Sequence, residues 1–162
     1  MVEGGAHGYW VVLASLFTAA VLAVIPLPAW LVWGRPEWIA LVLVYWCIAL
    51  PHRVGVVVAV FAGMAMDLLE GAVLGQNTFA LAVLALLSVA LYQRLRVFSL
   101  WQQSGIVFLL IGIHQLICQW VQNLEGVGAR SLLFLLPALT SALLWPLVLH
   151  TLRGLRRHYR VA

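Results

Sequence analysis

The chain has 162 residues, of which 65% are hydrophobic and only 9% are charged, against roughly half and roughly a quarter in an ordinary soluble domain. So little polar surface cannot cover a compact body in water, which excludes a soluble globule and means that the apolar exterior faces lipid. The formal net charge of +4 comes from nine arginines that lie singly between apolar stretches until the tail, which excludes the basic face of a nucleic-acid-binding protein.

Six apolar stretches follow one another along the chain. Pro26 and Pro28 interrupt the first and predict a kink or an early end of its helix. The second begins at Pro36, which suits the first turn of a helix, and this stretch is short for a membrane span. Gly75 closes the third stretch, and a basic tail follows the sixth. At about 20 residues for each span, the length allows at most about six. We therefore expect an all-α, polytopic membrane protein with a single transmembrane domain over residues 1–162 and six transmembrane helices, at about 9–33, 36–50, 54–74, 78–95, 104–121 and 131–152.

The distribution of arginines predicts the orientation of these spans. Six spans place both termini on the same side of the membrane, and cytoplasmic loops carry an excess of basic residues. With both termini in the cytoplasm, only Arg35 and Arg130 lie outside, and the inner segments hold Arg53, Arg94, Arg96, Arg153, Arg156, Arg157 and Arg160. Tryptophans near most span ends agree with this orientation, whereas Trp46 and Trp145 fit it less well. We expect both termini to be cytoplasmic.

The third stretch has a small residue or an aspartate at every fourth position, which keeps these residues on one slowly drifting helix face. Such a stripe lets a second helix approach closely in lipid, so we expect the third helix to be packed inside the bundle through this face. The helix-packing stripe consists of Gly55, Ala59, Gly63, Gly71 and Gly75.

Asp67 interrupts that stripe, about 20 Å from the inner boundary, and Glu70 lies one turn further out. A carboxylate at this depth costs about 3 kcal/mol, so it should face protein or a water-filled cavity, with Arg35 or Arg130 as its expected partner. One interpretation is an ion, proton or substrate pocket in the outer half of the membrane. The interpretation that the sequence favours is a structural ion pair or an anionic cap on a helix N-terminus.

The fifth stretch carries polar residues that allow more than one interpretation. His114 and Cys118 have the spacing of metal ligands on a helix, but a metal site needs three or four ligands. Gln115, Gln119 and Gln122 suit hydrogen bonds between helices, with a water-filled substrate path as the alternative. No catalytic, cofactor or metal site is assigned, and no enzyme activity is expected.

Two further groups of residues have simpler interpretations. Cys47 and Cys118 lie inside apolar stretches, where cysteine is usually a small buried hydrophobe, so no disulfide framework is expected. Basic residues at the cytoplasmic end would fix the topology, touch anionic lipid headgroups or bind a cytoplasmic partner. They are His52, Arg53, Arg153, Arg156, Arg157 and Arg160.

Several strings, in their order and spacing, closely resemble the MreD family of rod shape-determining inner-membrane proteins. The resemblance covers nearly the whole chain, although the stretch from about Ser104 to Leu136 departs from the family pattern. The strings are Arg35-Pro36-Glu37-Trp38, Tyr45-Trp46, Ala49-Leu50-Pro51-His52-Arg53, Gly63, Asp67-Leu68-Leu69, Gly71, Leu74-Gly75, Leu100-Trp101-Gln102-Gln103 and Leu144-Trp145-Pro146 before the basic tail.

The resemblance implies a non-enzymatic scaffold of the lateral cell-wall elongation machinery in the bacterial inner membrane. Its expected direct partner is MreC, a single-pass periplasmic coiled-coil protein. Through MreC it is expected to associate with the MreB cytoskeleton, the RodA glycan polymerase and the penicillin-binding transpeptidase of elongation. Lipid contact is expected, and self-association is open. The family also resembles the substrate-binding subunits of energy-coupling-factor transporters in fold, so the alternative is a small-molecule-binding transporter subunit with Asp67 and Glu70 in its pocket.

Overall fold

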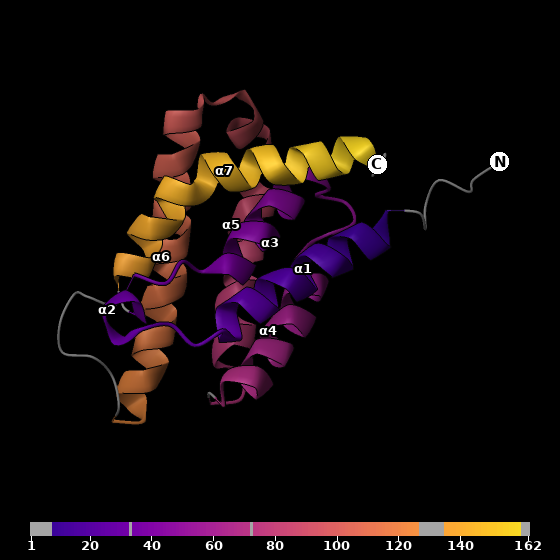
Figure 1. Ribbon diagram of the computed structural model, residues 1–162. Coiled ribbons are helices and arrows are strands. Elements are labelled where there is room, and N and C mark those ends of the chain that lie inside the picture. The colour runs from indigo at the N-terminus through magenta and orange to yellow at the C-terminus, as the bar shows by residue number, and fades with distance from the viewer. Residues whose placement is uncertain (1–7, 33, 72, 127–134, 160–162) are drawn as a thin grey trace.

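A computed structural model describes residues 8–32, 34–71, 73–126 and 135–159. The described residues contain seven α-helices and no strand. Figure 1 shows the helices gathered into one bundle. The helices are α1 (Tyr9–Val24), α2 (Ala29–Val32), α3 (Trp38–Ala49), α4 (Val56–Glu70), α5 (Gln76–Val97), α6 (Leu100–Leu124) and α7 (Leu136–His158).

The first apolar stretch is a helix for only part of its length. Helix α1 ends at Val24, and Ile25 has extended backbone angles because the ring of the following Pro26 disfavours the helical region. The expected early end is confirmed, and α1 covers only part of the expected span 9–33. After Pro28 the described residues form the short helix α2, of four residues.

The centre of the bundle is α3. Ten of its twelve residues are buried, and it contacts α1, α5, α6 and α7. Trp46 is fully buried and donates a hydrogen bond from Nε1 to Oγ of Ser15 in α1 at 2.8 Å. Trp145 is also fully buried, in α7. Both tryptophans therefore belong to the core rather than to a membrane interface, which explains why they fit the interfacial pattern poorly.

Helix α4 lies at the edge of the bundle and not inside it. Its buried residues all belong to one face, which packs mainly on α5, whereas large side chains such as Phe61 and Leu68 are exposed. The third helix is therefore not enclosed in the bundle as expected, because its small residues pack mainly against one neighbouring helix, α5, and its contact with α1 is smaller. The buried face consists of Ala59, Gly63, Met66 and Asp67.

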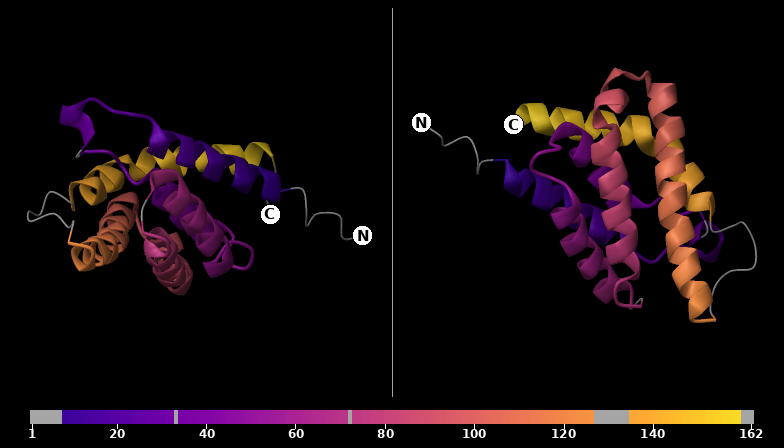
Figure 2. Two further views of the ribbon diagram at one scale, coloured as in Figure 1. Left: turned by 90° about the horizontal axis from the view of Figure 1, so that it is seen from below. Right: turned by 180° about the vertical axis from the view of Figure 1, so that it is seen from behind.

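Figure 2 shows α1 and the C-terminal part of α7 on one side of the bundle and α5 and α6 on the other. Helix α7 runs beside α6 and then turns across the end of the bundle (Figure 1). Pro146 lies inside this helix, where it removes a backbone hydrogen bond and bends the axis. The bend directs the C-terminal half of α7 over the end of α3.

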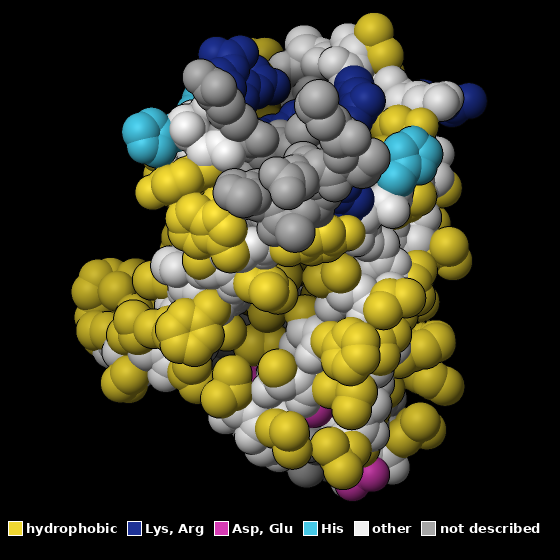
Figure 3. Space-filling view, turned by 90° about the vertical axis from the view of Figure 1, so that its right-hand side faces the viewer, with side chains coloured by type: hydrophobic (Ala, Val, Ile, Leu, Met, Phe, Trp, Pro, Cys, Tyr) yellow, Lys and Arg dark blue, Asp and Glu magenta, His cyan; other side chains and the backbone are white. Residues whose placement is uncertain are grey.

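Three helices, α5, α6 and α7, are long and apolar enough to cross a bilayer. The helices α1, α3 and α4 have 16, 12 and 15 residues, which gives lengths of about 24, 18 and 22 Å against a hydrocarbon core of about 30 Å. Figure 3 shows arginines gathered at one end of the molecule and acidic side chains at the other, with hydrophobic side chains between them. We call these the arginine end and the acidic end.

Candidate functional site

Asp67 binds the beginning of the next helix. It is 1% exposed, and its Oδ1 accepts a hydrogen bond from the Asn77 backbone N–H at 2.8 Å. Its Oδ2 accepts from the Gly75 N–H and the Thr78 hydroxyl, both at 2.9 Å, and from the Thr78 N–H at 3.4 Å. No side chain of α5 itself caps that helix. The carboxylate therefore supplies the acceptors that the first amides of α5 need and lies at the positive end of its dipole.

The turn between α4 and α5 depends on two glycines. Gly71 ends α4 with φ +65°, and Gly75 precedes α5 with φ +98°. Both angles lie in the left-handed region, which glycine enters at little cost. These conformations bring the chain back so that the first amides of α5 reach the Asp67 carboxylate.

Gly63 lies one turn before Asp67 and meets the same residues of α5. A Cβ atom built on Gly63 would lie 2.4 Å from Thr78 Cα and 2.7 Å from the Asn77 carbonyl oxygen. Only a residue without a side chain fits here. A Cβ on Gly55, Gly71 or Gly75 would have no atom within 4 Å. Gly55 and Gly71 flank α4 and Gly75 precedes α5, so these three members of the predicted stripe lie outside the close contact at Gly63.

Hydrogen bonds extend from this cap across the acidic end of the bundle. The Asn77 side chain donates to Glu70 at 3.0 Å, and its Oδ1 accepts from the Cys118 thiol of α6 at 3.9 Å. Gln115 of α6 donates to the carboxylate of Glu37, which precedes α3. This polar cluster links α4, α5, α6 and the start of α3. Sequence reasoning did not include Asn77 among the site residues, although asparagine shortly after a turn glycine is a signal for the start of a helix.

Arg35 does not pair with Asp67 as expected. Its guanidinium donates to the backbone carbonyls of Ala23 and Ile25, at the end of α1. Asp67 has no need of a cation, because a carboxylate has about four acceptor positions and four donors from Gly75, Asn77 and Thr78 already occupy them. Arg130, the other expected partner, lies outside the described residues.

The polar residues of α6 do not form a metal site. His114 is 2% exposed, and neither ring nitrogen has a hydrogen-bond partner among the described residues. Within the same part of the chain no group of three His, Cys, Asp or Glu could hold a metal ion. Gln119 donates to Asn123 within α6 at 3.3 Å, and Gln122 is only partly buried. Cys47 and Cys118 are both buried and free.

The basic residues predicted for the cytoplasmic end lie in different surroundings. His52 is exposed in the turn after α3, and the Arg53 guanidinium lies 5.8 Å from the centre of the Tyr9 ring. Arg153 and Arg156 line a small cavity, while Arg157 lies on the last turn of α7. Arg160 lies outside the described residues.

An open groove of about 820 Å³ separates α1 from α4. Its lining is almost wholly apolar, and small side chains on both walls leave room for a neighbouring helix. The groove residues are Leu13, Leu16, Phe17, Ala20, Val21 and Val24 of α1, Ile39 of α3, and Val58, Phe61, Ala62, Ala65, Leu68 and Leu69 of α4.

Three of the helices are apolar and long enough to span a membrane, so the fold is that of an all-helical membrane protein. Hydrogen bonds between polar side chains at the acidic end hold its helices together. The chain matches the model of the rod shape-determining protein MreD over residues 5–155. It is 32% identical over 153 residues to the rod shape-determining protein MreD of Haemophilus influenzae, and the match covers 94% of each chain. The chain therefore belongs to the MreD family, as the resemblance predicted.

Membership supports a role in cell shape, and the family is a shape-determining structural family and not a known enzyme family. No solved structure matches the chain.

Proposed function

We propose that this protein is a non-enzymatic scaffold of the lateral cell-wall elongation machinery that binds MreC within the inner membrane. Through MreC it would help to couple the MreB cytoskeleton to peptidoglycan synthesis by RodA and the penicillin-binding transpeptidase. The observation that carries the proposal is the apolar groove between α1 and α4, because one further helix could bind there.

The walls of the groove suit a transmembrane helix better than a small polar ligand. Leu13, Phe17, Phe61 and Leu68 are each more than 60% exposed along its rims. Ala20, Ala62 and Ala65 lie among them and allow close approach of a second backbone. A polar substrate would find almost no hydrogen-bonding groups there, whereas the single membrane span expected of MreC needs none.

The proposal includes six membrane crossings, by α1 and α3 to α7, with the arginine end in the cytoplasm. The gathering of arginines at one end supports this orientation. The short helices do not oppose it. Helix α3 is enclosed by protein, and α1 and α4 can be accommodated by local thinning of the bilayer at a cost of fractions of a kcal/mol for each ångström of mismatch.

Co-purification with MreC in mild detergent tests the groove. Ala65→Trp places an indole in the groove on an exposed position of α4, so we expect normal membrane levels and much reduced recovery of MreC. Ala90→Trp is the matched control, because Ala90 is also exposed, on α5, but lies outside the groove. Equal MreC recovery with both variants would refute the groove as the MreC site.

Mass spectrometry of the same preparations separates the alternatives. Near-stoichiometric MreC without a small molecule supports the scaffold. A defined small molecule, or an ATPase pair in place of MreC, would favour the transporter subunit, and a second copy of this chain cross-linked through the groove would assign the groove to self-association.

A further inference from the structure

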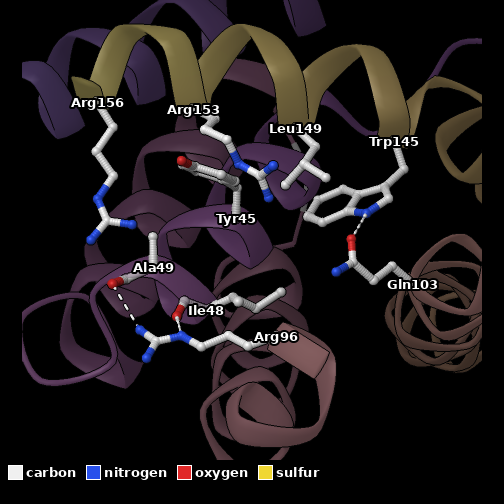
Figure 4. A pocket seen from close by; sticks show the side chains of 9 residues that line it. All are labelled: Tyr45, Ile48, Ala49, Arg96, Gln103, Trp145, Leu149, Arg153 and Arg156. Atoms are coloured by element: carbon white, nitrogen blue, oxygen red, sulfur yellow. Dashed lines mark hydrogen bonds between the residues drawn. The ribbon is translucent and has the colours of Figure 1, made fainter. Parts of the chain in front are cut away.

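A second cavity, of about 110 Å³, lies at the arginine end of the bundle (Figure 4). It is enclosed by the last turn of α3, the end of α5, the start of α6 and the half of α7 that follows the bend at Pro146. The lining residues are Tyr45, Ile48, Ala49, Arg96, Gln103, Trp145, Leu149, Arg153 and Arg156.

Three guanidinium groups line this small volume, from two different helices. Arg96 of α5 donates from Nε to the Ile48 carbonyl and from Nη2 to the Ala49 carbonyl, both at 3.1 Å. These bonds cap the end of α3 and hold the guanidinium in place, and they leave further N–H donors of the same group for a ligand. Arg153 and Arg156 extend from α7 toward the cavity, and the Tyr45 hydroxyl lies between them (Figure 4).

One wall of the cavity is fixed by an amide whose hydrogen bonds are made within the protein. Gln103 donates to the Leu95 carbonyl at 2.7 Å, and its Oε1 accepts from Nε1 of Trp145 at 3.2 Å. The side-chain oxygen of Gln103 is therefore engaged by the indole. The other polar side-chain groups of the lining are the three guanidinium groups and the Tyr45 hydroxyl.

No carboxylate of the described residues lines the cavity. The described acidic residues are Glu37, Asp67, Glu70 and Glu125, and the first three belong to the polar cluster at the other end of the bundle. Guanidinium groups stay protonated in proteins, so their mutual repulsion favours an anion between them. The cavity volume of about 110 Å³ leaves room for a small group of oxygens such as a phosphate.

We propose that this cavity is a binding site for a phosphate group, formed by Arg96, Arg153, Arg156 and Tyr45. Guanidinium groups match the oxygens of phosphate in geometry and charge. The ligand would be the phosphate of an anionic phospholipid, which would enter from the arginine end while its acyl chains stay beside the helices. Free inorganic phosphate has the same chemistry. The site does not depend on MreC binding.

Lipid binding to the full-length protein tests this site. The protein is reconstituted in phosphatidylcholine nanodiscs and titrated with phosphatidylglycerol or inorganic phosphate, with the melting temperature and native mass spectrometry as readouts. We expect phosphatidylglycerol to raise the melting temperature and to remain bound. Arg153→Gln, which removes one charge-assisted contact, should weaken this binding about tenfold.

Arg94→Gln is the matched control, because Arg94 is exposed on the same helix end as Arg96 and does not line the cavity. It should leave phosphatidylglycerol binding unchanged. Tyr45→Phe keeps the ring, removes one hydroxyl and should weaken binding less than Arg153→Gln, which gives a second test if the arginine variant is poorly folded.

A second outcome is that inorganic phosphate stabilises the protein and phosphatidylglycerol does not. If this stabilisation is lost in Arg153→Gln, the result supports the site and identifies the free anion as its ligand. Binding of neither compound would overturn the proposal. Equal losses in Arg94→Gln and Arg153→Gln would also overturn it, because they would show a diffuse attraction of charges and not a site.

Discussion

At the scale of single residues, Asp67 and Glu70 have different roles although one helix turn separates them. Asp67→Ala would leave the Gly75 and Asn77 amides and the Thr78 hydroxyl without an acceptor. We expect a loss of about 2 kcal/mol or more in stability, from the lost helix cap and the unsatisfied buried donors. Thermal unfolding in detergent, followed by circular dichroism, measures this loss.

Glu70→Ala provides the comparison for Asp67→Ala. Glu70 is exposed and accepts one hydrogen bond, from the Asn77 side chain, so its loss should cost less than about 1 kcal/mol. Asp67→Asn keeps the shape but removes the charge and one acceptor, and it should be intermediate. Equal melting temperatures for the two alanine variants would show that the cap is not important for stability.

Gly63 is the position where one added methyl group should matter most. In Gly63→Ala the new Cβ would lie within 2.4 to 2.7 Å of backbone atoms of residues 77 and 78, which can give way only if α4 and α5 separate. Overpacking of this kind costs about 1–3 kcal/mol. We expect reduced folded yield, measured by size-exclusion chromatography of the protein extracted from membranes, and a larger loss for Gly63→Leu.

Gly112→Ala is the control for Gly63→Ala. Gly112 lies inside α6, and a Cβ there would meet no atom within 4 Å, so alanine should be neutral or stabilise by about 0.5–1 kcal/mol. Gly71→Leu should also reduce the yield, but through strain at φ +65° and not through a clash. Similar yields of Gly63→Ala and Gly112→Ala would contradict the close α4–α5 contact.

At the scale of elements, Pro146 sets the course of α7. Pro146→Ala restores the missing backbone hydrogen bond, so we expect a straighter helix. Spin labels at positions 143 and 157 lie on either side of the bend, after replacement of the two native cysteines. In Pro146→Ala the backbone distance between positions 143 and 157 should approach roughly 21 Å, the length of a straight helix over fourteen residues. An unchanged distance distribution in electron paramagnetic resonance would show that packing, and not the proline, bends α7.

The sequence predicts where helices break better than which helices are buried. Pro26 marks the end of the first helix correctly, and the turn at Gly75 lies where the third and fourth apolar stretches separate. The central place of α3 could not be predicted, because a helix that faces lipid and a helix that faces protein are equally apolar in a membrane. For the same reason the edge position of α4 is visible only in the structure.

The candidate site shows the same limit. The spacing of Asp67 in the third stretch predicts a buried carboxylate, and a helix cap was among its interpretations. The pairing with α5 depends on the left-handed conformations of Gly71 and Gly75, which bring residues 75–78 back to the carboxylate. The cavity of Arg96 and Arg153 joins residues 57 positions apart and depends on the bend in α7, so no local pattern in the sequence indicates it.

At the scale of the whole molecule, the separation of arginines and carboxylates predicts the orientation in the membrane. Arg94 lies in the last turn of α5, Glu125 directly follows α6, and both are exposed. In spheroplasts, Glu125→Cys should react with a membrane-impermeant maleimide, whereas Arg94→Cys should react only after permeabilisation, because basic ends stay in the cytoplasm. The reverse labelling pattern would invert the proposed topology.

The cap formed by Asp67 also has a consequence for how the chain enters the bilayer. Lipid offers no hydrogen bonds, so a helix that inserts alone exposes the free amides of its first turn, and a lone carboxylate is just as poorly solvated there. In this protein the carboxylate of α4 and the amides at the start of α5 form hydrogen bonds with each other across a turn of a few residues. The two helices are therefore suited to leave the translocon together, as a preassembled hairpin and not as successive single spans.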